Sequence, residues 1–233
     1  MQKISNFFII SLLFLMISSI NSKAVVFDTW IIEGSNPLQM AEATERFKEM
    51  AMSGGAKYLD IRASAKFRGD RPQDTSFIFG YYENVEDMLE TQSLVNQNPD
   101  WFQSTYGEVD GTVMTSATFA NNEDYVAAPV GATIAYQIVE IENFISFITN
   151  YPKLKKMMAE AGAPAALSSA NCMICATEVL PGNTVIWMSA ANSSDLGKAM
   201  DIFRSPEIQR WVYSNMRPIL DIKDAGMHTI ISK

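Results

Sequence analysis

The chain repeats one internal spacing, and this constrains its fold more than any single motif does. Three pairs of residues at matching points of the pattern lie 107 positions apart: Glu33 and Glu140, Gly55 and Gly162, Pro99 and Pro206. A unit of that length holds several helices and strands, and two copies would bury their apolar faces in the same order. The spacing therefore predicts a duplicated domain and leaves its function open.

The first 24 residues have the pattern of a secretory signal. Lys3 precedes an apolar run at residues 7–20, and Ser22-Lys23-Ala24 places small residues before a cleavage point. A membrane-spanning helix needs about 20 apolar residues, and this run has 14. Cleavage after Ala24 is therefore favoured over a retained anchor. We expect a secreted or periplasmic protein with no stable membrane anchor.

The mature chain is acidic. Removing Lys3 and Lys23 with the signal lowers the basic count from 18 to 16, against 26 acidic residues, which gives a net charge of −10. Such a surface repels phosphate backbones, so no nucleic-acid partner is expected. A hydrophobic fraction of 48% is ample for a core. Whether the chain forms a homo-oligomer is left open.

The pattern of the first copy indicates a strand, a helix, two strands, two helices and a strand. A proline after a turn opens the first helix at Pro37, and Gly54-Gly55 ends it. The expected ranges are strand 26–33, helix 37–54, strand 58–67, strand 75–82, helix 85–95, a short helix from Pro99, and strand 112–119.

The second copy follows in the same order, with Pro152 expected to kink or split its first helix. The expected ranges are strand 133–140, helix 142–161, strand 166–180, strand 184–190, helices 195–203 and 206–215, and strand 227–231. The predicted organisation is a signal at residues 1–24, a first repeat at 25–124 and a second at 125–233. Each repeat has the β-α-β-β-α-β order of ferredoxin-like domains.

This order resembles the dimeric α+β-barrel superfamily, which includes antibiotic-biosynthesis monooxygenases, stress-responsive barrel proteins, NIPSNAP-like proteins and chlorite dismutases. The resemblance covers residues 25–233 and rests on element order, not on a signature motif. It implies an α+β fold in which two ferredoxin-like repeats pack as a pseudo-dimeric barrel around a pocket. The chemistry stays open, because function lies in sites and not in folds.

Period-two alternation supplies the candidate ligand-binding residues. If Phe27 and Ile31, with Ile134 and Ile138, face the helices, their strand neighbours face the barrel interior. The candidates chosen on this basis are Asp28, Trp30, Asp60, Arg62 and Gln137, with Ser64 beside them. Two carboxylates and an arginine could orient a small polar ligand. The alternative is an ion pair of Arg62 with Asp28 or Asp60 inside a filled barrel.

His228 is the only histidine and completes the set of candidates. A histidine can act as a general base or a haem ligand, and it binds haem in some α+β-barrel proteins. No motif of those proteins surrounds Met227-His228-Thr229. The commoner alternative is a packed or surface side chain.

Cys172 and Cys175 lie three positions apart on a predicted strand. On a regular strand their side chains point to opposite faces, so a disulfide requires a bulge or turn there. Two buried free thiols are favoured, with a local disulfide as the alternative in an oxidising compartment. One histidine and two cysteines do not form a four-ligand zinc site, and no metal site is predicted.

The sequence is compatible with three functions. The favoured one is an exported protein that binds a small molecule in a pocket between two sheets. The second is a protein-interaction module with a filled barrel and an exposed apolar patch. The third, implied by the resemblance alone, is a cofactor-free monooxygenase-like or isomerase-like enzyme, for which a general base such as His228 or Asp28 must reach the pocket.

Overall fold

The computed structural model describes residues 25–69, 71–121, 126–175 and 182–233. The predicted signal, its cleavage point after Ala24 and the expected boundary between residues 124 and 125 lie outside these ranges. Within the described part no helix is both long and apolar enough to span a bilayer.

Both halves of the chain contain the elements that the sequence predicts. The first half consists of β1 (Val25–Glu33), α2 (Pro37–Ser53), β2 (Tyr58–Gly69), β3 (Ser76–Tyr82), α3 (Val85–Gln97), α4 (Pro99–Tyr106) and β4 (Thr112–Asn121). The second consists of β5 (Thr133–Ile141), α5 (Phe144–Glu160), β6 (Ala166–Cys175), β7 (Thr184–Ala190), α6 (Ser193–Phe203), α7 (Pro206–Asn215), a 3-10 turn (Arg217–Ile219) and β8 (Leu220–Ile230).

Local sequence signals place the ends of several helices. Asparagine caps four of them, since Asn36, Asn84, Asn143 and Asn192 each accept hydrogen bonds from backbone N–H groups of the first turn. Two glycines that lie 107 positions apart, Gly55 and Gly162, follow the first helix of each half with φ of 98° and 75°. This left-handed conformation suits glycine, which has no Cβ.

Three of the predicted ranges need correction. Pro152 does not split α5, which is one helix from Phe144 to Glu160. The last strand is longer than predicted, because β8 already begins at Leu220 and pairs with β5 from there. Strand β6 ends at Cys175, and the rest of the predicted strand, residues 176–180, lies outside the described ranges.

The eight strands form a closed barrel in the order β1-β3-β2-β8-β5-β7-β6-β4, and all neighbouring strands are antiparallel. Each half contributes its strands in the order fourth, first, third, second: β4-β1-β3-β2 and β8-β5-β7-β6. The halves join where β2 pairs with β8 and where β4 pairs with β6. Closure leaves no free sheet edge.

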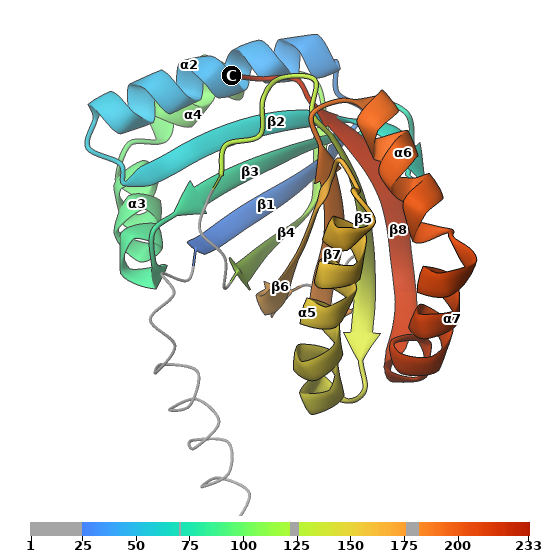
Figure 1. Cartoon of the computed structure of the whole chain (residues 1–233). Helices are drawn as coiled ribbons and strands as arrows, with labels where there is room; N and C mark the ends of the chain where they lie inside the picture. The colour runs from blue at the N-terminus through green and yellow to red at the C-terminus, as the bar shows by residue number, and fades with distance from the viewer. Residues whose placement is uncertain (1–24, 70, 122–125, 176–181) are drawn as a thin grey trace, which may run out of the picture.

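The helices lie on the outside of the barrel, with α2, α3 and α4 over the first half and α5, α6 and α7 over the second (Figure 1). Each helical group packs on its own sheet through an apolar core, one containing Phe47 and Ile61 and the other Leu154 and Val139. A third apolar cluster, around Phe27, fills part of the barrel interior. The protein therefore has two helix-sheet layers and an interior that the two sheets share.

Candidate functional site

The barrel interior contains a cavity of about 680 Å³. Its walls come from strands of both halves and from two connecting segments, residues 126–129 and 163–165. The cavity reaches one end of the barrel. Its lining includes the first residues of β1 and β6, Val25 and Ala166, and the last residues of β4 and β7, Asn121 and Ala190. A volume of this size is typical of small-molecule sites.

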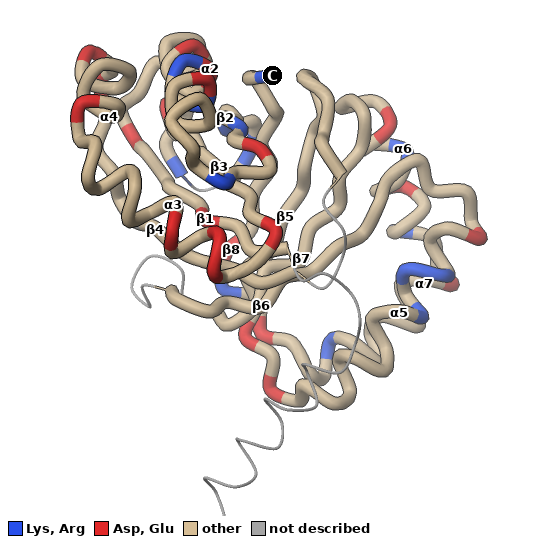
Figure 2. Tube along the Cα trace, turned by 90° about the vertical axis from the view of Figure 1, so that its left-hand side faces the viewer, with Lys and Arg blue, Asp and Glu red and all other residues tan. Residues whose placement is uncertain are grey.

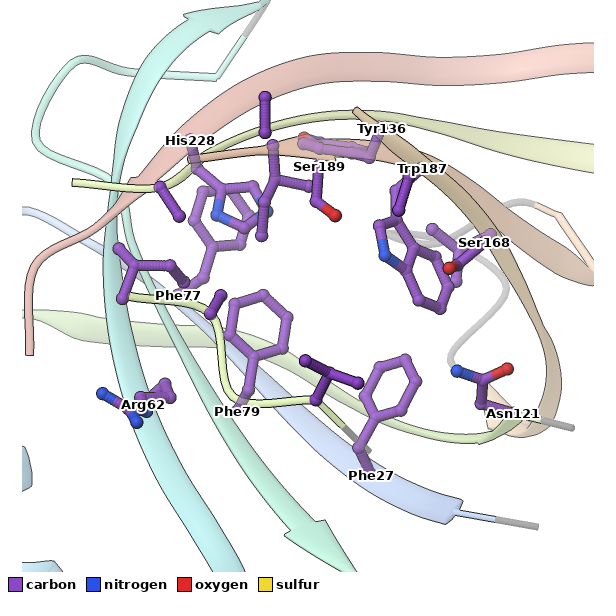
Figure 3. Close-up of a pocket in the computed structure, with 18 of the residues that line it drawn as sticks. Phe27, Arg62, Phe77, Phe79, Asn121, Tyr136, Ser168, Trp187, Ser189 and His228 are labelled. Atoms are coloured by element: carbon purple, nitrogen blue, oxygen red, sulfur yellow. The ribbon is translucent and has the colours of Figure 1, made fainter. Parts of the chain in front are cut away.

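Aromatic rings form much of the wall (Figure 3). The ring of Phe27 stacks on Phe119 with centroids 5.2 Å apart and meets Trp187 edge-on at 6.0 Å. Because Phe27 lies on β1 and Trp187 on β7, this contact joins the two halves across the interior. Phe77 and Phe79 continue the wall along β3. Such a lining favours a flat, apolar ligand.

His228 is a buried titratable side chain of this cavity. The residue is 4% exposed, and its imidazole lies against three rings, with centroids 5.1 Å from Phe77, 5.4 Å from Phe79 and 5.9 Å from Tyr136. Burial lowers the pKa of His228 to about 3, so the ring is neutral at pH 7. Nδ1 is buried and has no hydrogen-bond partner among the described residues.

The remaining polar groups of the lining are uncharged, apart from Arg62. Thr29 lies on β1, and its Oγ1 is also buried without a partner among the described residues. Asn121 and Ser168 lie on the side of Trp187, and Ser189 lies between His228 and Trp187 (Figure 3). Burial raises the pKa of Tyr81, another lining residue, so its hydroxyl stays protonated at neutral pH. These groups can hydrogen-bond a ligand without adding charge.

Arg62 lines the cavity as predicted, but its guanidinium is engaged elsewhere. Nε donates to Asp60, Asp60 also pairs with Lys48 of α2, and Nη1 of Arg62 donates to the carbonyl of Ser232 at 3.1 Å. The predicted alternative of an Arg62–Asp60 ion pair is therefore confirmed, although the barrel is not filled. Asp60 is buried in this cluster and does not line the cavity.

The predicted direction of the alternation on β1 and β5 was wrong. Phe27 and Ile31, with Ile134 and Ile138, face the cavity and not the helices. Asp28, Trp30 and Gln137 therefore lie on the outer side of the barrel and do not line the cavity. Trp30 packs with the helical core of the first half, and Gln137 is exposed. The error arises because β1 is apolar on both faces.

Asp28 has a structural environment that the sequence did not reveal. The residue is 3% exposed, and its carboxylate accepts hydrogen bonds from Tyr82 at 3.1 Å, Gln92 at 2.8 Å and Thr118 at 2.7 Å. These donors come from β3, α3 and β4, so the carboxylate ties a helix to two strands. A buried carboxylate with three donors is satisfied in the core.

Sequence reasoning missed the aromatic wall and Thr29. Trp187, Tyr136 and Phe79 belong to apolar strand patterns that a plain core residue would share, so no signal separated them from the core. Gly226 could have drawn attention, because a glycine within a strand often marks a close approach. A Cβ there would lie 2.7 Å from the hydroxyl oxygen of Tyr136, the residue opposite it on β5.

Cys172 and Cys175 form a disulfide, which corrects the expectation of free thiols. The required bulge is present, because Phe119 pairs with Cys172 and Thr118 with Ile174, which leaves Met173 without an opposite residue. The bulge lets both side chains meet, with their Cα atoms 6.1 Å apart. Both cysteines pack against the aromatic cluster of the barrel interior.

The surroundings of His228 do not fit a haem ligand. A metal-bound histidine normally donates its second ring N–H to a carboxylate, a carbonyl or water. Nδ1 of His228 has no such acceptor among the described residues, and Phe77 and Phe79 lie against the ring. Nor does the described part of the chain contain a group of three or more His, Cys, Asp or Glu residues that could hold a metal ion.

Comparison with known proteins gives information on the fold alone. No family model matches the sequence, and no curated protein matches it. Solved structures do match over almost the whole chain. One, from Fusobacterium nucleatum, is named a "putative monooxygenase"; it has a TM-score of 0.56 at 11% identity and covers 90% of this chain and 93% of that one.

Two further solved structures match the same fold over almost the whole chain. An anthrone oxidase-like protein has a TM-score of 0.55 at 11% identity, covering 91% of this chain and 92% of its own. A mutant chlorite dismutase from Candidatus Nitrospira defluvii has a TM-score of 0.50 at 7% identity, covering 88% and 91%. This chain has the α+β-barrel fold. The predicted fold class is confirmed at that level, and the barrel's chemistry depends on its own cavity.

Proposed function

We propose that this α+β barrel binds an uncharged, mainly apolar small molecule between its two sheets. The observation that carries the proposal is the cavity of about 680 Å³ with walls of aromatic rings. Burying apolar ligand surface there is favourable by about 25 cal/mol per Å². A few hydroxyl groups and one imidazole remain to orient the ligand.

The distribution of charge supports an uncharged ligand. Strands β3, β4, β6 and β7 contain no charged residue, and Figure 2 shows charged residues mainly along the helices and turns. The one charged residue of the lining, Arg62, is paired with Asp60. Moving a ligand charge from water into such a cavity would cost several kcal/mol.

A filled barrel, which the interaction-module alternative requires, is at odds with this cavity. Exposed apolar side chains do occur, for example Ile145 and Ile148 on α5, but nothing in the structure indicates a partner for them. Binding is therefore favoured over a purely structural role.

Oxygen-dependent oxidation of the bound molecule is a second candidate. Its support is the fold shared with the protein named a putative monooxygenase and with the anthrone oxidase-like protein. Against it stands the low pKa of His228, since a base with a pKa of about 3 is weak at neutral pH. Oxygen uptake by the protein with its co-purified ligand would support this candidate.

The test of binding is native mass spectrometry of the mature protein, paired with its denatured mass. A mass excess that disappears on denaturation supports a bound molecule and identifies it. Ser189→Trp should reduce the excess, because Ser189 lines the cavity and the larger ring occupies part of the space that a ligand needs. Gln137→Trp places the same ring on the exposed outer side and should retain it. No excess, and no binding of added apolar probes, would contradict the proposal.

We also propose that the chain is exported and arose by duplication of a ferredoxin-like unit. Export is supported by the pattern of residues 1–24 and by a disulfide typical of oxidising compartments. Duplication is supported by the matched strand order of the two halves and by the spacing of 107 residues. The N-terminal sequence of protein recovered outside the cytoplasm tests export: Val25 as first residue supports it, and an intact Met1 contradicts it.

A further inference from the structure

We infer that His228 selects the ligand: its neutral imidazole forms a hydrogen bond with the polar group of an uncharged aromatic molecule such as a phenol or aromatic alcohol. This inference rests on the proposed binding function and specifies its ligand class. It assigns His228 a recognition role and not that of a general base.

The position of the imidazole is fixed by its neighbours. Phe77 and Phe79 lie against it from β3, and Tyr136 from β5, with centroid distances between 5.1 and 5.9 Å. Because aromatic packing restricts the ring, a ligand that bonds to it does so at little cost in side-chain entropy. A ring held in this way favours one ligand orientation.

The imidazole also has hydrogen-bonding capacity that the described protein does not use. Nδ1 is buried without a partner, although buried polar groups are nearly always paired. An unpaired buried group destabilises the protein, and a ligand hydroxyl that pairs with it removes that cost. A ligand of the same shape without the hydroxyl leaves Nδ1 unpaired.

The surroundings keep the imidazole neutral. Its cross-strand neighbours are Lys66 on β2 and Ile134 on β5, and the rings against it belong to Phe77, Phe79 and Tyr136. None of these is acidic, so no carboxylate stabilises an imidazolium ion. The unprotonated nitrogen of a neutral imidazole can accept a hydrogen bond from a hydroxyl group but has little tendency to remove its proton.

Matched probes test this inference. 1-Naphthol and naphthalene share one ring system and differ by a hydroxyl group, and both are uncharged at pH 7. We expect wild-type protein to bind 1-naphthol roughly two- to tenfold more tightly than naphthalene, and His228→Phe to bind both alike. Thr29→Val is the control, because Thr29 is the other lining residue with an unpaired buried oxygen.

A second measurement uses the wild-type protein and covers the case in which His228→Phe fails to fold. His228 is the only histidine, so labelling histidine with ¹⁵N in an untagged chain gives the signals of one imidazole. We expect 1-naphthol to shift a ring-nitrogen resonance strongly and naphthalene to shift it little.

The outcomes separate the two proposals. If neither probe binds and no ligand co-purifies, the binding function fails. If both probes bind equally to wild-type protein, or if Thr29→Val and not His228→Phe removes the preference, the role of His228 is overturned while binding stands. A preference for 1-naphthol that only His228→Phe removes supports the inference.

Discussion

The imidazole of His228 stacks on the ring of Phe79, with centroids 5.4 Å apart and planes 25° from parallel. Phe79 belongs to β3 of the first half and His228 to β8 of the second. The contact therefore exists only when the two halves close into one barrel, and unfolding returns the imidazole to water. The pKa of His228 consequently reports on the folded barrel.

Acid should destabilise the protein through His228. Its pKa is about 3 when folded and 6.5 in the unfolded reference, so between these values the unfolded chain binds a proton that the folded one does not. The free energy of unfolding therefore falls as pH decreases through this window, by up to about 1.4 kcal/mol per pH unit. Above pH 6.5 this contribution does not change with pH.

Urea unfolding at pH 7.0 and pH 4.5 checks this, with His228→Phe as the comparison. Wild-type protein should lose about 2 to 3 kcal/mol more than the variant over this interval. Equal losses for both proteins would mean that His228 is accessible to protons in the folded state.

Asp28→Ala should lower stability without affecting the cavity. The substitution leaves the donors of Tyr82, Gln92 and Thr118 without their acceptor, at an expected cost of about 2 to 4 kcal/mol. Binding of 1-naphthol at a temperature where the variant is folded should match wild type. Gln137→Ala, at an exposed position, should change stability by less than about 0.5 kcal/mol. A stable Asp28→Ala variant with lost binding would place Asp28 in the site after all.

Gly226→Ala should alter the cavity wall. The new Cβ would lie 2.7 Å from the hydroxyl oxygen of Tyr136 and 2.9 Å from its ring, so Tyr136 must move. We expect a loss of about 1 to 3 kcal/mol in stability and a changed affinity for 1-naphthol. Gly197→Ala is the control: nothing lies within 4 Å of its added Cβ on α6, and it should gain about 0.5 to 1 kcal/mol. Unchanged affinity in Gly226→Ala would show that Tyr136 does not shape the site.

Replacing Cys172 and Cys175 by serine should reduce stability only modestly. The disulfide closes a loop of four residues, for which chain-entropy reasoning gives about 2 kcal/mol. Thermal unfolding of the oxidised protein and of the double variant measures the difference. Alkylation without reductant should leave the wild-type mass unchanged, and a labelled product would contradict the disulfide.

Most elements could be predicted from the sequence because their signals are local. Proline and asparagine at helix starts, and glycine in the left-handed conformation at Gly55 and Gly162, act within a few residues. The element order then indicated the barrel. The disulfide was judged wrongly because the bulge at Met173 depends on the partner strand β4.

The candidate site was predicted only in part, and the reason is geometric. Alternation in the sequence separates the two faces of a strand, but β1 is buried on both faces, so its pattern does not say which side faces the helices. Arg62 and His228 were placed at the cavity, whereas Asp28, Trp30 and Gln137 were assigned to the wrong side. The sequence by itself determined the helices, the strands and their order. Only the closed barrel decided that Phe27, Phe79 and Trp187 meet around a cavity, because their contacts join strands that are far apart in the chain.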